Sequence, residues 1–203
     1  MAFQPSDRPV SSAAELRDRY AAGEREFSRA KLWGASLGEL DLMRANLAGA
    51  YLSGADLSTS SLDCADLCRA DLVAAHLFGA SLSGARLTGA NLSSADLGGA
   101  KLWGVNLNYA NLIAARLVGA YLRESTLMGA KLWQADMSYA DLTYTTFAGA
   151  KLKESVLVRA KLYGADFRAT TLDGALLTGA YYSEDTLFPN NFNPATAGMQ
   201  FVD

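Results

Sequence analysis

The sequence predicts an all-β solenoid, a rod in which the chain turns after every short unit and presents the same face inward each time. The first observation is a five-residue repeat that runs almost unbroken from residue 30 to residue 189. Every fifth position is a large apolar residue, nearly always leucine, and a small residue, usually alanine, stands two positions before it. This period fits neither an amphipathic helix nor a flat strand, which have periods of about 3.6 and 2.

The second observation is that departures from the regular inward residues recur at intervals of 20. Val105, Ser125 and Thr145 replace the small alanine at successive steps of 20, and Phe147 and Phe167 replace the leucine 20 residues apart. Inward residues of unusual size pack against residues of similar size in the next coil, without voids, only if one coil contains 20 residues. Four units then form each square coil, and the repeat makes about eight coils, a rod of about 38 Å at an interstrand spacing of about 4.8 Å.

The third observation is the position of the prolines. A coil bonds to its neighbours through backbone N–H groups, which proline lacks, so prolines should lie outside the coils. They do, and the 4 prolines of the chain are Pro5, Pro9, Pro189 and Pro194.

The units resemble those of the pentapeptide-repeat family, whose consensus is A(D/N)LXX. The resemblance covers about four-fifths of the chain. It implies a right-handed quadrilateral parallel β-helix with a narrow bore filled by leucine. Units with Lys101, Arg116, Tyr121 or Lys151 at the second position depart from the consensus, but that position points outward and leaves the expected fold intact. Matching units begin at Ala45, Ala55, Ala65, Ala70, Ala95, Ala110 and Ala140.

The predicted organisation has three parts: a polar N-terminus with a capping helix (1–29), the β-helix (30–189), and a C-terminal tail that covers the last coil (190–203). Residues 1–10 are expected to be mobile. A short helix then begins at Ser12, with Glu15 at capping-box spacing and Gly23 as its stop signal. Leu16 and Tyr20 lie on one helical face, so the helix is expected to cover the apolar end of the first coil.

The C-terminal tail is expected to close the other end. Leu187 keeps the five-residue register, and Phe188, Phe192 and Met199 follow it. These three side chains are expected to fold over the last coil, because an uncovered coil is an exposed sheet edge. Members of the resembling family often pair through such an end, which implies a monomer or an end-to-end homodimer.

Composition argues against several classes of function. The net charge is −3 with both signs interspersed, which does not favour nucleic acid or an anionic membrane as a partner. There is no apolar run of about 18 residues and no leader pattern, so we expect a cytoplasmic protein. No serine or cysteine has a histidine base within plausible reach, and a leucine-filled bore offers no pocket, so no enzyme activity and no cofactor are expected.

His76 and the two cysteines are the remaining candidates for chemistry. His76, the only histidine, lies outward between Asp56 and Asp96 at spacings of 20. It could be a pH-sensitive or metal-binding group, but a solvated surface histidine is favoured because no second histidine or cysteine stands beside it. Cys64 and Cys68 flank one corner; a disulfide is conceivable, and free thiols are favoured in an unexported protein. No metal site is predicted.

One face of the rod is the main candidate for binding. Its last five coils each carry one outward aromatic residue, and basic residues lie among them. Exposed aromatic and arginine side chains are enriched at binding hot spots. Alternatively, the rings stack as a ladder that stabilises neighbouring coils. The predicted protein-binding residues are Trp103, Tyr121, Arg123, Tyr144, Lys161 and Tyr163, and we call them, together with Lys101, Asp141 and Tyr181, the aromatic face. A second, weaker candidate face carries Trp33, Ile113, Trp133, Lys131, Lys151 and Lys153.

The sequence therefore predicts a non-catalytic protein–protein interaction scaffold, with a regulatory role and an unidentified protein partner. The alternative is a DNA mimic, since some members of the resembling family imitate duplex DNA in size and charge and bind topoisomerases. That alternative needs a dense acidic surface. Basic residues interrupt such a surface at Arg116, Arg123, Lys131, Lys151, Lys153, Arg159, Lys161 and Arg168.

Overall fold

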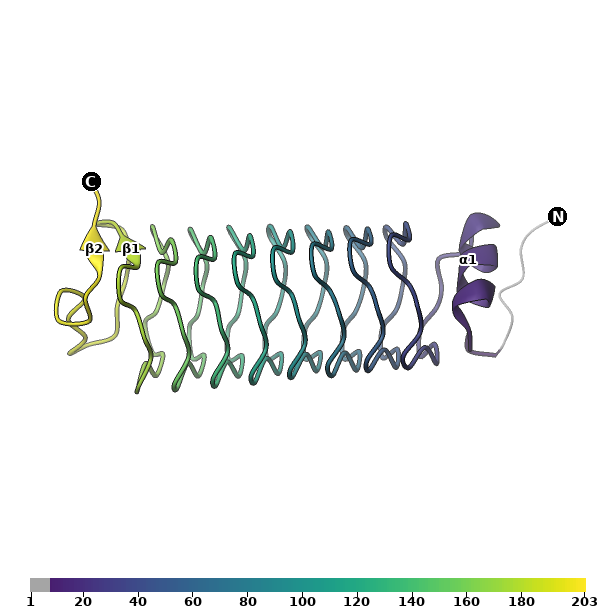
Figure 1. Cartoon of the computed structure of the whole chain (residues 1–203), viewed down its shortest axis with the longest axis horizontal. Helices are drawn as coiled ribbons and strands as arrows, with labels where there is room; N and C mark the ends of the chain where they lie inside the picture. The colour runs from purple at the N-terminus through teal and green to yellow at the C-terminus, as the bar shows by residue number, and fades with distance from the viewer. Residues whose placement is uncertain (1–7) are drawn as a thin grey trace.

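The computed structural model describes residues 8–203 as a straight rod with α1 at one end and the pair β1 and β2 at the other (Figure 1). Helix α1 spans Ala13–Ala21, β1 spans Tyr181–Tyr182 and β2 spans Gln200–Phe201. From Glu26 to Leu187 the chain forms parallel bridges, and each joins residues 20 apart except the last, from Asp166 to Leu187, which spans 21. One such ladder begins at Glu26 and returns at Asn46, Asp66, Arg86, Asn106, Thr126, Thr146, Asp166 and Leu187, which confirms eight coils.

The predicted inward register is confirmed along the body of the rod. From Leu32 to Phe167 every residue at the large inward position is at most 1% exposed. The rings of Phe147 and Phe167 stack with their centroids 4.7 Å apart and their planes within 6°. The core is therefore one column of side chains in which each coil packs only on its two neighbours.

Buried hydroxyl groups explain why polar residues recur at the same inward corner. Ser125 and Thr145 are both fully buried. The Ser125 hydroxyl donates to the carbonyl of Leu102 at 2.7 Å, and that of Thr145 donates to the carbonyl of Leu122 at 2.8 Å. Each hydroxyl thus finds its acceptor one coil earlier, so its burial leaves no unpaired polar group.

The backbone of each unit is bonded mainly to the adjacent coils. In the unit around Leu52, the N–H of Tyr51 donates to the carbonyl of Ala30 in the preceding coil at 2.8 Å. The N–H groups of Leu52 and Gly54 donate to carbonyls of the following coil at 2.7 and 2.8 Å. The N–H of Ala55 closes a turn onto Leu52 at 3.0 Å, so four of the five N–H groups in this unit have backbone acceptors.

Aspartate or asparagine at the second position of a unit accepts a hydrogen bond from the one remaining N–H group, that of the fourth position. Oδ1 of Asp56 accepts from the N–H of Ser58 at 2.9 Å, and Oδ1 of Asn106 accepts from the N–H of Asn108 at 3.0 Å. This Asx turn stabilises the corner that follows. Sequence reasoning treated this position only as an outward one and missed its local role.

Helix α1 begins as predicted, with a shift in the capping box. The hydroxyl of Ser12 accepts from the N–H of Glu15 at 3.1 Å. The carboxylate of Glu15 accepts in return from the N–H of Ser11 at 3.1 Å, one residue before the N-cap. Gly23 follows the helix with a φ of 95°, as the predicted stop requires.

The N-terminal lid includes a residue that was expected to be mobile. Leu16 is fully buried and Tyr20 donates a hydrogen bond to the carbonyl of Met43 at 3.1 Å. Val10 is only 1% exposed and its carbonyl accepts from the N–H of Lys31 at 2.7 Å. The expectation of mobility is therefore wrong at Val10, because its side chain is needed to cover the first coil; residues 1–7 lie outside the described residues.

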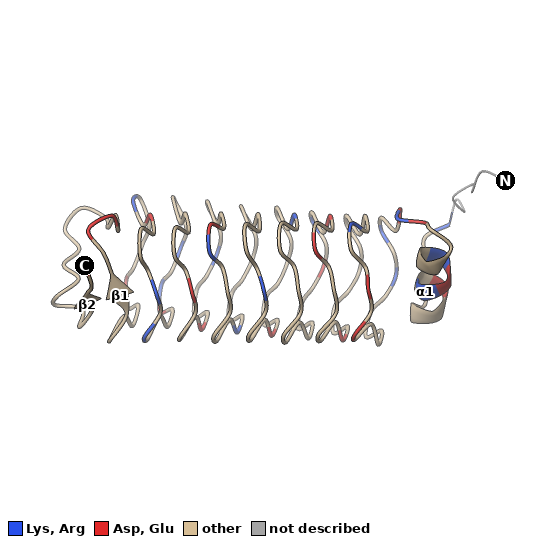
Figure 2. Ribbon diagram, turned by 90° about the horizontal axis from the view of Figure 1, so that it is seen from above, with Lys and Arg blue, Asp and Glu red and all other residues tan. Residues whose placement is uncertain are grey.

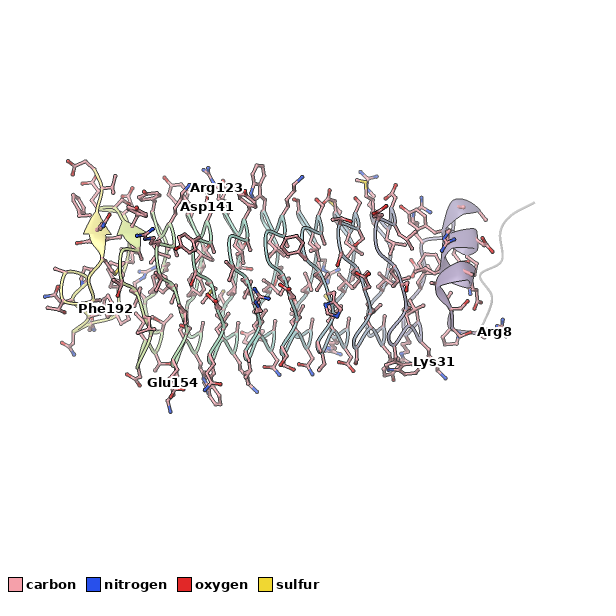
Figure 3. The ribbon with its side chains drawn as sticks, viewed as in Figure 1. Arg8, Lys31, Arg123, Asp141, Glu154 and Phe192 are labelled. Atoms are coloured by element: carbon pink, nitrogen blue, oxygen red, sulfur yellow. The ribbon has the colours of Figure 1, made fainter. Side chains whose placement is uncertain are left out.

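The C-terminal end corrects the predicted register at Leu187. Asp166 pairs with Leu187, which is 21 residues later instead of 20. Leu187 consequently faces outward and is 41% exposed, while Phe188 stacks on Phe167 with centroids 6.0 Å apart. Phe192 stacks on Phe188 at 5.0 Å, and its label in Figure 3 lies at this end of the rod.

We predict that a leucine matters to stability through its inward position rather than its type. Leu107 is fully buried in the middle of the rod, whereas Leu176 lies at an outward bridge position and is 54% exposed. Leu107→Ala should lower the free energy of unfolding by about 2–5 kcal/mol. The matched Leu176→Ala should cost less than about 1 kcal/mol. Chemical denaturation measures both, and equal losses would contradict the inward register.

The corrected register at the C-terminal end gives a second prediction. Phe188→Ala removes a ring from the stack of phenylalanines, so hydrogen-exchange protection in the last two coils should fall clearly. The matched Leu187→Ala removes an exposed side chain and should leave that protection nearly unchanged. A larger effect at Leu187 than at Phe188 would restore the register expected from the sequence.

Candidate functional site

The aromatic face is one side of the rod over its C-terminal half. Bridges join Lys101, Tyr121, Asp141, Lys161 and Tyr181 in that order, so these residues form one continuous row across five coils. Trp103, Arg123, Tyr144 and Tyr163 lie at the two outward positions that follow this row. The structure therefore brings together all the residues that sequence reasoning assigned to this face; Arg123 and Asp141 lie on the same edge of the rod in Figure 3.

Trp103 lies between two hollows in this face. One hollow of about 320 Å³ is lined by Ser83, Lys101, Trp103 and Tyr121. The other, of about 220 Å³, is lined by Trp103, Gly104, Arg123 and Glu124. The indole is 56% exposed, so it projects between the two hollows with cationic side chains on both sides. This arrangement offers apolar and charged contacts to a surface placed against it.

The tyrosines of the face differ in their surroundings. Tyr144 is 54% exposed, and its ring covers Gly164 so closely that a Cβ there would clash with Cε1. Tyr163 is half-buried. Burial raises the pKa of Tyr163 above its ordinary value, and the nearby Tyr181 and Asp141 add to the shift. The phenol of Tyr163 is therefore a neutral donor near pH 7.

The rings of the aromatic face do not form a stacked ladder. In residues 8–203, ring–ring contacts occur near α1, between Trp33 and Tyr51, and along the phenylalanine stack with the tail; none joins two members of this face. The rings lie singly on the surface, so mutual stacking is not what holds them in place.

The second candidate face is divided into separate patches. Trp33 lies against Tyr51 near the N-terminal end, with ring centroids 5.1 Å apart. Trp133 lies five coils away, where the ammonium group of Lys151 is 5.9 Å from the ring centroid. Since about 24 Å of rod separates the two tryptophans at the spacing of parallel strands, they do not form one compact site.

His76, Cys64 and Cys68 occupy the positions predicted from the sequence. His76 is exposed and bridges to Asp56 and Asp96 on either side. Over the described residues 8–203, no group of three or more potential ligands is arranged to hold a metal ion. Cys64 and Cys68 are free thiols, and burial, with the adjacent Asp66, raises the pKa of the Cys68 thiol.

Sequence reasoning missed a basic groove near the N-terminal end. A hollow of about 730 Å³ runs across four coils and is open to solvent. Three of its lining residues, Arg29, Arg69 and Arg86, are arginines. They stand 40 and 17 residues apart in the sequence, so only the 20-residue coil reveals them as neighbours. The remaining lining residues are small: Ser28, Ala48, Gly49, Cys68 and Thr88.

Comparison with known proteins decides the family. The sequence profile described as "Pentapeptide repeats" matches eight copies in this chain, over residues 26–63, 65–104, 106–143 and 140–179. The chain belongs to the pentapeptide-repeat family. Its fold is accordingly the right-handed quadrilateral β-helix predicted from the units. No catalytic family is among the matches, and no curated protein matches the chain.

Three solved pentapeptide-repeat structures illustrate the range of similarity. HetL from the cyanobacterium Nostoc sp. strain PCC 7120, described as involved in heterocyst differentiation regulation, is 35% identical, covering 85% of this chain and 84% of HetL with a TM-score of 0.64. The protein alr5209 from Nostoc PCC 7120 is 25% identical, covering 97% of this chain and 100% of its own with a TM-score of 0.26. QnrB1, a plasmid-mediated fluoroquinolone resistance protein, is 15% identical over 88% and 90% of the two chains with a TM-score of 0.50, a likeness of fold alone.

In residues 8–203 of this pentapeptide-repeat chain, no helix is long and apolar enough to cross a membrane.

The Asx turns of this pentapeptide-repeat chain predict a specific response to acid. Hydrogen bonds from Ser58 lower the pKa of Asp56. At Asp66, burial raises the pKa, but hydrogen bonds from Cys68 and the charge of Arg86 outweigh it and lower the pKa overall. A lowered folded-state pKa stabilises the protein above the unfolded value of about 3.9, and that contribution is lost as the pH falls through the folded value.

Asparagine keeps the turn acceptor but does not titrate, so Asp56→Asn combined with Asp66→Asn should lose less stability than the native chain between about pH 5 and pH 2. At pH 7 the double variant should lie within about 1 kcal/mol of the native chain, because the exposed Asp66–Arg86 pair contributes little. Thermal melting across this pH range measures both effects. Parallel curves for the two proteins would show that these carboxylates are not coupled to folding.

Proposed function

We propose that this chain is a non-catalytic scaffold that binds a protein partner through its aromatic face. The observation that carries the proposal is the exposure of Trp103 between two hollows, with Lys101 and Arg123 beside it. Large aromatic side chains flanked by arginine are the residues that dominate binding energy at protein interfaces. The absence of ring stacking within this face, among the described residues, favours binding over a purely stabilising ladder.

A regulatory role is part of this proposal. It is supported by the 35% identity to HetL, which is described as involved in the regulation of heterocyst differentiation. A rigid rod suits such a role because its surface is presented without rearrangement when a partner binds. The cytoplasmic location and the monomeric or end-to-end dimeric state stay predictions.

The mixed charge of the surface argues against the DNA-mimic alternative. Blue and red segments are interspersed along the rod in Figure 2, and the net charge is only −3. Within the aromatic face, Lys101, Arg123 and Lys161 offset Asp141, and Glu124 lies next to Arg123. A protein that binds DNA presents a basic surface, which a mimic must match with a dense negative one.

The proposal predicts the loss of a partner without loss of the fold. Trp103→Ser, Tyr144→Ser and Tyr163→Ser together should weaken binding of a partner captured by the native chain at least about thirtyfold, the factor for one hot-spot residue. Circular dichroism should stay nearly native, because the large inward residues of the rod are unchanged. Capture from the native lysate, followed by titration with the identified partner, measures the effect.

A matched triple variant supplies the control. Trp33→Ser, Tyr109→Ser and Tyr139→Ser remove one exposed tryptophan and two exposed tyrosines from the other three faces. This control should retain the partner. A result in which the aromatic-face variant keeps its partner but melts well below the native chain would establish the rings as stabilising elements instead.

A further inference from the structure

We propose that the basic groove formed by Arg29, Arg69 and Arg86 binds an extended acidic segment of a polypeptide. The groove lies at the opposite end of the rod from most of the aromatic face and on a different side, so it is a separate site. Its floor is formed by the small residues Ala48, Gly49 and Cys68, which leave room for a chain to lie across the coils.

Arg29 and Arg69 supply charge that the protein itself does not neutralise. In residues 8–203, neither guanidinium forms an ion pair, whereas Arg86 pairs with Asp66 at 3.1 Å. Both unpaired arginines are exposed. Guanidinium groups bind carboxylates through paired hydrogen bonds, which makes an anionic ligand the natural complement.

Arg29 and Arg69 both lie against glycine corners of the next coil. A Cβ built at Gly49 would lie 3.7 Å from Cγ of Arg29, and one built at Gly89 would lie 3.7 Å from Cγ of Arg69. Each side chain therefore lies along the rod over a corner that has no side chain of its own. Arg29 and Arg69 start two coils apart, about 9.6 Å at the spacing of parallel strands, so their charges form a row rather than a cluster.

The shape of the groove selects an extended ligand. Small-molecule sites are concave and enclose most of the ligand surface, whereas this groove is shallow and open along four coils. Single phosphate groups need converging donors, and the two unpaired arginines do not converge. An extended chain with spaced anionic side chains can contact both.

Charge on the flanks favours polypeptide over nucleic acid. Glu26 and Asp66 lie in the bridge row beside the groove, and Asp71 stands at the next unit. A nucleic acid carries a charge on every phosphate and would meet these carboxylates, and three arginines fall short of the several phosphate contacts that such binding uses. Acidic side chains spaced along a peptide avoid the flanking carboxylates.

The test uses the full chain and a fluorescent synthetic peptide of alternating glutamate and serine, followed by anisotropy at low salt. The native chain should bind this peptide saturably, and added salt should weaken the binding. Arg29→Gln with Arg69→Gln should weaken binding about tenfold and flatten its salt dependence.

Arg44→Gln with Arg159→Gln is the matched control. Both are exposed corner arginines with positive φ and no ion pair in the described part of the chain, and they lie on two other faces. This control changes the net charge equally and should alter binding less than about twofold. The proposal is overturned by equal weakening in the two double variants, by no saturable binding to the native chain, by equal binding of a glutamine–serine peptide, or by equally tight binding of oligothymidylate.

Discussion

A left-handed backbone at the corner of every unit is the constraint on which the rod depends. The corner residues from Arg29 to Gly179 all have a φ between 52° and 70°, whether or not they are glycine. Even Thr59, a β-branched residue, has a φ of 55°. Such a conformation costs of order 1–3 kcal/mol outside glycine. It persists because the corner N–H donates to the next coil, as that of Thr59 does to the carbonyl of Phe78 at 2.9 Å.

This dependence on the next coil makes the two ends of the rod the places where the pattern must change. At the first coil, Val10 and Leu16 provide the apolar contacts that a preceding coil would otherwise supply. At the last, Phe188 and Phe192 continue the column of rings beyond the regular units. The two ends are covered by different elements. The leucines of the first coil are covered by a helix, whereas at the last coil the phenylalanine rings of the tail extend a stack that begins at Phe147.

The sequence predicts the body of the rod better than its ends for a physical reason. Periodicity identifies an inward residue only where every unit has five residues. The N–H of Ser183 donates to the hydroxyl of Thr186, and the turn at this bond accommodates one extra residue. Both Leu187 and Phe188 are large enough to continue the pattern. Val10 was missed because it precedes the repeat. The aromatic face was placed correctly on one side of the rod, but the absence of ring stacking depends on side-chain rotamers, which periodicity does not contain.

The 20-residue spacing between coils also limits which side chains fit on the outer surface. That surface is the part of the chain available for function. Several long side chains at corners lie over a corner 20 residues later that is glycine. The ring of Tyr109 covers Gly129, where a Cβ would lie 2.8 Å from the ring, and that of Tyr144 covers Gly164. These glycines are needed for space as well as for their backbone angle. Arg29 lies over Gly49 in the same way with a charged group, but less tightly, since a Cβ there would lie 3.7 Å from Cγ of Arg29. A corner residue followed by glycine one coil later therefore marks a side chain that lies along the rod, and the basic groove is built from two such pairs.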